Sequence, residues 1–170
     1  MLTITTDRAS LRPLEPVPSN SGVTGPVPAI LFTAFEPSGD DHAAAVIAEL
    51  RRRFPAVPIY AWGGPKMAKA GAIVVERTGD DAVVGMPGMK KIREHQRLNE
   101  RIGDWMRTHP VSVFVPVDSP GANFPLAKYA RSMGITVVHL VAPQIWAWGR
   151  WRIHKLRART DHVLCLLPFE

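Results

Sequence analysis

Three short polar segments, each directly after an apolar run, carry side chains that could do chemistry. The first reads FEPSGDD, and its candidate ligand-binding residues are Glu36, Ser38, Gly39 and Asp40. Carboxylates here would repel the anion that a helix N-terminus otherwise attracts, so the segment favours a ligand with hydroxyls or a cationic group. The same residues also make a good strand-to-helix junction, with Ser38 or Asp40 as the helix cap, and the sequence leaves both interpretations open.

The second segment follows the apolar run VSVFVPV and reads DSPGAN. Asp118 ends a strand that we expect to be central and buried, where a low dielectric tends to raise the pKa of a carboxyl group. Asp118 is therefore the candidate general base towards a bound hydroxyl. The alternative is that Asp118 only ties down the following loop, through Asn123 or backbone amides.

The third segment reads VAPQIWAWGRWRIHKLRART. Trp146 and Trp148 could stack on sugar rings or shield acyl chains, and Arg150 could neutralise a phosphate. Aromatic plugs at a sheet edge followed by a solvated basic helix would explain the same residues. No RRM, KH or helix-turn-helix pattern supports nucleic-acid binding, so we expect no nucleic-acid partner.

Apolar runs alternate with helical patterns from residue 29 onward, which is typical of a parallel sheet covered on both faces. The expected strands are Ala29 to Ala34, Pro58 to Trp62, Ile73 to Val75, Val111 to Val117, Thr136 to Val141 and His162 to Leu167. The expected helices are Asp41 to Arg53, Pro65 to Ala70, Met89 to Thr108, Asn123 to Met133 and Arg150 to Arg159. The predicted fold class is α/β, a Rossmann-like parallel six-stranded sheet with helices on both faces. In such a sheet ligands bind beyond the carboxyl ends of the strands, where the three polar segments begin.

Composition limits the classes of protein to consider. The 170 residues suffice for one domain, and 46% hydrophobic with 21% charged residues excludes wholesale disorder. The net charge of +6 suits an anionic partner. No window reaches the roughly 20 apolar residues of a membrane-spanning helix, so any membrane contact would be peripheral. Residues 1–28 are rich in proline, serine and threonine, and we expect a disordered leader there.

Other residues that often do chemistry receive structural interpretations. The single cysteine, Cys165, lies in the apolar run HVLCLL and is expected to be a buried thiol in a reducing compartment. The histidines lack the spacing of metal ligands, so we expect no metal and no cofactor. The helix from residue 89 should carry a basic face, with Ile92, Leu98, Ile102 and Trp105 pointing inward.

The ordered series of motifs resembles the lipid-A-disaccharide synthase family. The series is EPSGD after the first strand, GGPKM after the second, AVVGM before the long helix, VDSPGANF after the fourth, HLVAPQIWAW after the fifth and LCLLPFE at the end. The resemblance spans Ile30 to Glu170 and implies the N-terminal half of a GT-B glycosyltransferase, with residues 29–170 as the acceptor-side domain and no C-terminal UDP-binding domain in the chain.

The resemblance also implies an activity and a set of site residues. The family inverts configuration while it moves 2,3-diacylglucosamine from UDP to the 6-hydroxyl of 2,3-diacylglucosamine 1-phosphate in lipid A biosynthesis. By position, the essential aspartate of its D-A-P-D-F-N motif falls on Asp118, and the motif's asparagine falls on Asn123, a substrate-binding candidate. The implied partners are the two sugar lipids, an anionic membrane surface, and a separate C-terminal half or a second copy. The implied location is cytoplasmic, peripheral on the inner face of the inner membrane.

Two departures from the family pattern keep other functions open. Gly121 and Ala122 replace the second aspartate and the phenylalanine of the motif, and the long helix is basic where the family carries an apolar patch. A catalytically silent module that binds an acylated sugar phosphate or an anionic membrane is the main alternative. An enzyme acting on another UDP-sugar, such as an epimerase, is a third possibility.

Overall fold

Six strands form one parallel sheet in the computed structural model, which describes residues 28–79, 89–142 and 153–166, without the side chains of residues 89–92. The strands are β1 (Ala29–Ala34), β2 (Ile59–Gly63), β3 (Ile73–Arg77), β4 (Val111–Val117), β5 (Thr136–Leu140) and β6 (His162–Leu164). Their order across the sheet is β3-β2-β1-β4-β5-β6, and every neighbouring pair is parallel. The predicted α/β fold with a six-stranded parallel sheet is confirmed.

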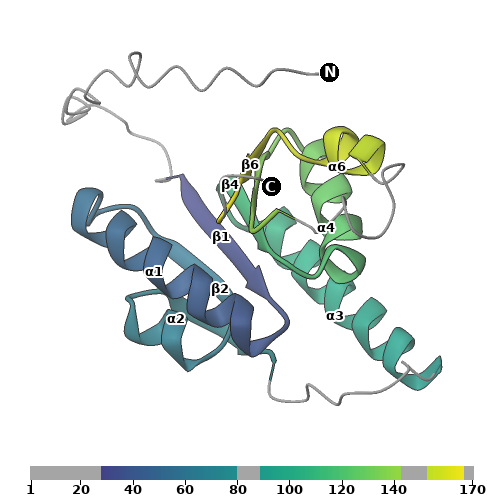
Figure 1. The fold of residues 1–170 in the computed structure, drawn as a ribbon, viewed down its shortest axis with the longest axis horizontal. Helices are drawn as coiled ribbons and strands as arrows, with labels where there is room; N and C mark the ends of the chain where they lie inside the picture. Colours follow the sequence, from purple (N-terminus) through teal and green to yellow (C-terminus); the bar gives the residue numbers. More distant parts are fainter. Residues whose placement is uncertain (1–27, 80–88, 143–152, 167–170) are drawn as a thin grey trace.

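Helices cover both faces of this sheet (Figure 1). They are α1 (Pro37–Arg53), α2 (Pro65–Lys69), α3 (Met89–Thr108), α4 (Pro120–Ser132) and α6 (Ile153–Arg159). Successive side chains of a strand point to opposite faces, so Leu31 packs with residues of α3 and α4 while Phe32 packs with residues of α1 and α2. The core therefore consists of two apolar clusters, one on each side of the sheet.

Several helices and strands differ in length from the prediction. Helix α1 begins at Pro37 rather than Asp41, and α4 begins at Pro120 rather than Asn123. Proline is favoured at the first helical position because its missing N–H would lack a partner there in any case. The expected capping of α1 by Ser38 or Asp40 is wrong, because Glu36 is the N-cap residue and makes no side-chain capping bond. Strand β3 extends to Arg77, and β6 ends at Leu164.

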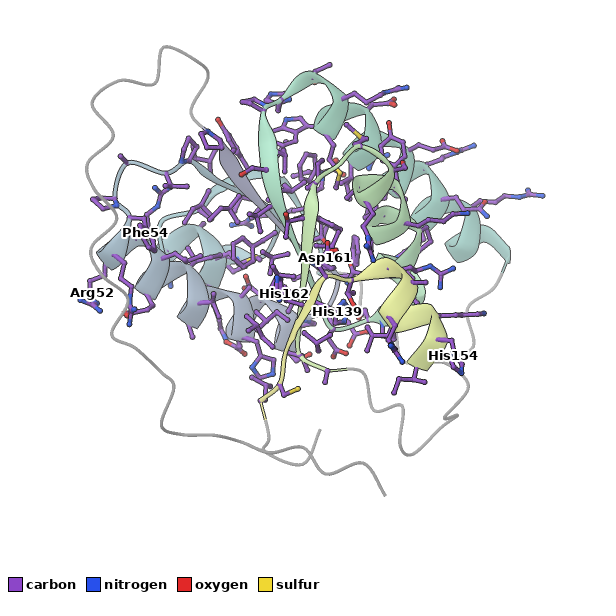
Figure 2. The ribbon with its side chains drawn as sticks, turned by 90° about the horizontal axis from the view of Figure 1, so that it is seen from above. Arg52, Phe54, His139, His154, Asp161 and His162 are labelled. Carbon is purple, nitrogen blue, oxygen red and sulfur yellow. The ribbon has the colours of Figure 1, made fainter. Side chains whose placement is uncertain are left out.

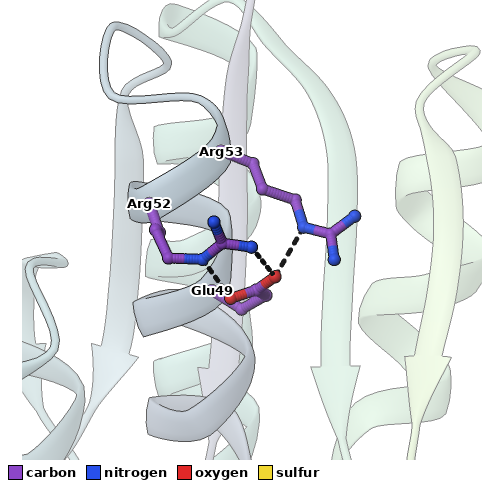
Figure 3. A network of polar contacts seen from close by, with 3 residues as sticks. All are labelled: Glu49, Arg52 and Arg53. Carbon is purple, nitrogen blue, oxygen red and sulfur yellow. Dashed lines mark hydrogen bonds and ion pairs between the residues drawn. The ribbon is translucent and has the colours of Figure 1, made fainter. Parts of the chain in front are cut away.

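The carboxyl-terminal end of α1 is held by arginines. Arg51 donates to the carbonyl oxygens of Val57 at 2.7 Å and Gly71 at 2.9 Å, which ties the helix to the loops before β2 and β3. Arg52 and Arg53 both donate to the carboxylate of Glu49 on the exposed side of the helix (Figure 3). Their hydrogen bonds lower the pKa of Glu49 to about 2. This network lies at the end of the molecule away from the polar segments that follow β1 and β4.

Helix α3 has the amphipathic character that its sequence predicts. Ile102 is fully buried, Leu98 and Trp105 pack partly buried against the same cluster, and Arg93 and Arg97 are exposed. The inward position expected for Ile92 lies outside the described side chains. None of the helices within the described ranges is long and apolar enough to cross a membrane.

Two expectations about the ends of the chain have different outcomes. Cys165 is exposed, so the prediction of a buried thiol is wrong; β6 is an edge strand, and Leu164 beside it is also 44% exposed. The leader expected at residues 1–28 lies outside the described residues except for Pro28.

Candidate functional site

The strand order reverses between β1 and β4, and this switch point brings two of the polar segments together. Strands β1 and β4 pair in register up to Ala34 and Val117, so their carboxyl ends are adjacent. The chain leaves β1 into α1 on one face and leaves β4 into α4 on the other. In such sheets ligands bind between two turns of this kind, and we refer to this region as the crevice. The hydroxyl of Ser119 donates to Oε1 of Glu36 at 2.8 Å across this crevice.

The turn from β4 into α4 has an uncommon backbone conformation. Asp118 has φ 46° and Ser119 has φ 39°, both in the left-handed region that non-glycine residues rarely adopt. Each such residue costs roughly 1–2 kcal/mol, and strain of this kind is concentrated at functional sites. Val141, at the end of neighbouring β5, has φ 69°, so the strained non-glycine residues of the described chain all follow two adjacent strands.

Asn123 holds the strained turn from beneath. Its side chain is fully buried; its Nδ2 donates to the carbonyl oxygens of Val117 at 3.0 Å and Asp118 at 2.9 Å, and its Oδ1 accepts from the Thr33 hydroxyl at 2.7 Å. These bonds occupy both ends of the amide. Asn123 therefore supports the turn from the protein interior, which is not the position of a substrate-contacting residue that the sequence suggested.

Asp118 is the carboxylate that the turn leaves available. Its side chain is half-buried, its backbone N–H donates to Leu140 O at 2.9 Å, and its carboxylate accepts no hydrogen bond within the described part of the chain. The other acidic residues near the crevice all have partners: Glu36 has Ser119, Asp41 has Lys66, and Asp40 has backbone amides. Asp118 thus retains its full capacity to accept a proton or a hydrogen bond from a ligand.

Asp40 has a structural role. It is 6% exposed, and its two carboxylate oxygens accept from the backbone N–H groups of Gly64 at 3.1 Å, Lys66 at 3.0 Å and Met67 at 3.0 Å. A carboxylate at this place satisfies the unpaired amides at the start of α2 and complements the helix dipole. The acidity of Asp40, which the sequence suggested for ligand binding, is used to join α1 to α2.

Of the other two candidates in this segment, Gly39 has a packing role, whereas Ser38 remains available to a ligand. Gly39 is buried, and a Cβ atom at this position would lie 3.1 Å from Ala34 Cβ and 3.6 Å from Val117 Cγ1. Glycine therefore lets α1 approach the ends of β1 and β4 closely, a packing role. Ser38 is exposed in the first turn of α1, next to Glu36, and remains a candidate ligand-binding residue.

A further segment, after β3, adjoins the crevice and was missed from the sequence. Thr78 Oγ1 donates to Ala34 O at 2.6 Å, and Gly79, with φ 92°, lies against the backbone of Glu36. Ser119 was also missed. The rule that ligands bind beyond strand ends would have found Thr78 and Gly79, because they directly follow β3 in the sequence.

Other candidates fall outside the described residues or outside the crevice. Trp146, Trp148 and Arg150 lie in residues 143–152, which the structure does not describe. Within the described ranges, no three histidine, cysteine, aspartate or glutamate side chains are grouped as ligands for a metal ion.

His139 is a buried titratable group near the site. It lies on β5, one residue before the strand ends, and its ring faces Phe124 of α4 with centroids 6.0 Å apart. Figure 2 shows it in the interior, whereas His154 on α6 lies at the periphery. The side chain is fully buried and neither ring nitrogen has a hydrogen-bond partner in the described structure. Burial lowers the pKa of His139 from 6.5 to about 4, so the ring is neutral at pH 7.

Comparison with known proteins identifies the family in which this crevice occurs. The sequence model of the family described as lipid-A-disaccharide synthetase matches residues 30–170. The chain belongs to this family. The lipid-A-disaccharide synthase of Myxococcus xanthus is 34% identical over 144 residues, which are 84% of this chain and 38% of that protein. Those of Nitrosococcus oceani (35% over 150 residues) and Paraburkholderia xenovorans (38% over 143 residues) each align with 37% of their own length, and with 84% and 83% of this chain respectively.

The chain thus spans somewhat more than a third of the lipid-A-disaccharide synthases that it matches. The two residues that differ from the family motif, Gly121 and Ala122, lie in the first turn of α4. Gly121 is exposed, and an added Cβ atom would meet nothing within 4 Å. Ala122 is partly buried against the core, and its carbonyl oxygen accepts from Asn99 Nδ2 at 3.1 Å. Gly121 therefore has room for a side chain on the helix surface, and Ala122 is accommodated by packing against α3.

Proposed function

We propose that residues 29–170 form the acceptor-side domain of an inverting glycosyltransferase that makes the lipid A disaccharide. The observation that carries this proposal is Asp118, a carboxylate without a hydrogen-bond partner in the described structure, at a strained turn opposite Glu36. Its place, at the switch point of a Rossmann-like sheet, is where such folds bind ligands. The proposed substrates, which the family resemblance implies, are UDP-2,3-diacylglucosamine as donor and 2,3-diacylglucosamine 1-phosphate as acceptor.

The chemistry assigned to the crevice is a single displacement. Asp118 removes the proton from the acceptor's 6-hydroxyl as that oxygen forms a bond to C1 of the donor sugar. The bond from C1 to the UDP oxygen breaks on the opposite face, and UDP leaves with the bonding electron pair. One well-placed base suffices for such an inverting transfer, and general base catalysis contributes roughly 10²–10⁴-fold.

Glu36 and Ser38 are proposed to bind acceptor hydroxyls beside the base. Ser119 donates to Oε1 of Glu36, and Glu36 is exposed, so its other carboxylate oxygen is proposed to accept from a sugar hydroxyl. Trp146 and Trp148 are proposed to contact the sugar or its acyl chains, and Arg150 the phosphate. Recognition of UDP is assigned to a C-terminal region, as the family resemblance implies.

Membrane association is the further part of the proposal. Arg93 and Arg97 are exposed on α3, and each basic side chain near an anionic lipid surface contributes about 1 kcal/mol of attraction. We therefore place the domain peripherally on the cytoplasmic face of the inner membrane, where both substrates would be reached.

The test is to join residues 1–170 to the remaining C-terminal part of the Myxococcus xanthus relative and to assay disaccharide formation from the two sugar lipids. The proposal predicts a disaccharide product and release of UDP in equal amounts. The departure at Gly121 favours one competing function, a binding module without catalysis. Co-sedimentation with anionic vesicles, without sugar transfer in any combination with a C-terminal half, would support that module instead.

A further inference from the structure

The strained turn that presents Asp118 is connected to β1 by a buried pair of polar side chains. Thr33 lies on β1 and Asn123 on α4, and both are fully buried. The Thr33 hydroxyl donates to Asn123 Oδ1 at 2.7 Å, which fixes the orientation of the amide. The amide nitrogen then points at the two successive carbonyl oxygens that precede and belong to Asp118.

This orientation matters because the amide nitrogen bonds the carbonyl oxygens of the two successive peptide units that flank Asp118. Val117 O and Asp118 O accept from the same Nδ2 at 3.0 and 2.9 Å, which requires the chain to turn sharply at Asp118. The turn has φ values of 46° and 39° at Asp118 and Ser119, conformations that persist only where the surroundings hold them. Without the amide, the turn would relax towards the extended or right-handed conformations that these residues prefer, and the direction of the Asp118 side chain would change.

We infer that Thr33 and Asn123 are positioning residues for the general base: they hold the left-handed turn that directs Asp118 into the crevice, and neither contacts the substrate. The inference rests on the proposed function for its consequence in catalysis. It assigns to the Thr33 hydroxyl the role of orienting the Asn123 amide, which otherwise could rotate and present its oxygen to the two carbonyl groups.

The variants that test this inference preserve shape and change one hydrogen bond. Thr33→Val removes the hydroxyl with little change in volume, and Thr33→Ser retains it. Asn123→Asp replaces the amide donor with an oxygen that would face Val117 O and Asp118 O. The matched control is Ile47→Val, a fully buried residue of α1 in the apolar cluster on the other face of the sheet, away from the turn.

The first measurement is kinetic, in the protein completed with the relative's C-terminal part. Because misplacement of a reacting group by about 1 Å can cost roughly 10²-fold, Thr33→Val and Asn123→Asp are expected to lower kcat by about 10- to 100-fold. The KM values of both sugar lipids should stay within about twofold of the unmodified protein, since no substrate contact is lost. Thr33→Ser and Ile47→Val are expected to keep kcat within about twofold. An unchanged kcat in Thr33→Val, or a loss confined to KM, overturns the inference.

The second measurement needs no activity and uses the 170-residue chain alone. Strong intraresidue NOEs between the amide and α protons mark positive φ, and we expect them at Asp118 and Ser119 in the unmodified chain and in Thr33→Ser. They should weaken in Thr33→Val and Asn123→Asp while the rest of the spectrum is retained. Persistence of both NOEs in the two variants overturns the inference. If the completed protein makes no disaccharide while these NOEs respond as expected, the proposed function fails and the positioning of the turn stands.

Discussion

Lowering the pH from 7 to 4.5 is expected to destabilise the fold through His139. The ring is buried without a hydrogen-bond partner in the described structure, and burial lowers its pKa from 6.5 to about 4. A group whose pKa is lower in the folded state binds its proton more readily after unfolding. The free energy of unfolding is therefore not reduced by His139 above pH 6.5, and it decreases as the pH falls from 6.5 towards 4.

The magnitude follows from the width of that window. Well between the two pKa values each pH unit costs about 1.4 kcal/mol of the free energy of unfolding, and the slope is smaller close to either value. The fall from pH 6.5 to 4.5 therefore costs about 2 kcal/mol. This range isolates His139 from the paired carboxylates. Glu49 does not interfere, because Arg52 and Arg53 lower its pKa from 4.5 to about 2 and its titration lies below this range.

The assay is urea unfolding at several pH values between 7 and 4.5, with His139→Leu as the test variant. Leucine fills a similar volume and leaves no buried nitrogen unpaired, so the variant should be at least as stable as the unmodified chain at pH 7. Its free energy of unfolding should also depend less on pH, by about 2 kcal/mol over the range from 6.5 to 4.5. His162→Gln, an exposed position on β6, is the control and should retain the full dependence. Equal pH dependence in His139→Leu and the unmodified chain would refute the reasoning.

Three further predictions concern stability, each measured by thermal or urea unfolding. Asp40→Asn is expected to lower the free energy of unfolding by about 2 kcal/mol, because the NH₂ group of asparagine would face a backbone N–H at the start of α2, donor against donor. A loss below about 0.5 kcal/mol would argue against the capping role. Gly121→Ala should stabilise the chain by about 0.5–1 kcal/mol, because the site is helical and the added methyl group meets nothing within 4 Å. Gly134→Ala, at φ 77°, serves as its control and should destabilise by about 1 kcal/mol. Glu49→Gln is expected to leave the melting temperature unchanged at pH 7, since the side chains of this network are 46–68% exposed (Figure 3); a clear loss would mean that the surface network stabilises the fold.

Much of the fold could be predicted from the sequence because local signals are strong in a parallel sheet. The continuous apolar runs of β1 and β4 and the long amphipathic pattern of α3 predict those elements at the bounds that the structure gives. Helix starts were less predictable. Pro37 and Pro120 begin α1 and α4, whereas the sequence was interpreted as if each proline lay in the preceding turn.

The sequence predicted that the polar segments lie beyond the strand ends, and the structure places those after β1 and β4 side by side there. The division of roles among their residues depends on distant contacts. Asp40 and Asp118 have the same side chain and lie in similar post-strand segments. Asp40 is occupied by amides 24 to 27 residues away, and no local pattern indicates those contacts. The Asn123 side chain likewise makes its hydrogen bonds inside the protein, one of them with a threonine 90 residues earlier in the chain. Cys165 was expected to be buried because its neighbours are apolar, yet an edge strand exposes it.

The family relationship and the geometry support different parts of the account. Similarity over 84% of this chain establishes membership of the lipid-A-disaccharide synthase family, and it covers 38% of the Myxococcus xanthus relative. The geometry distinguishes Asp118, with an unoccupied carboxylate in the described structure, from acidic neighbours that serve the fold. The central claim is therefore that Asp118 is the base.

The most direct test of that claim is the turnover of Asp118→Asn in the protein completed with the relative's C-terminal part. Asparagine has nearly the same shape but cannot accept the proton, so kcat is expected to fall by about 10²–10⁴-fold at pH 7. Asp41→Asn, a carboxylate at the same edge that pairs with Lys66, is the control and should retain nearly full activity. Disaccharide formation by Asp118→Asn at the rate of the unmodified protein would contradict the account.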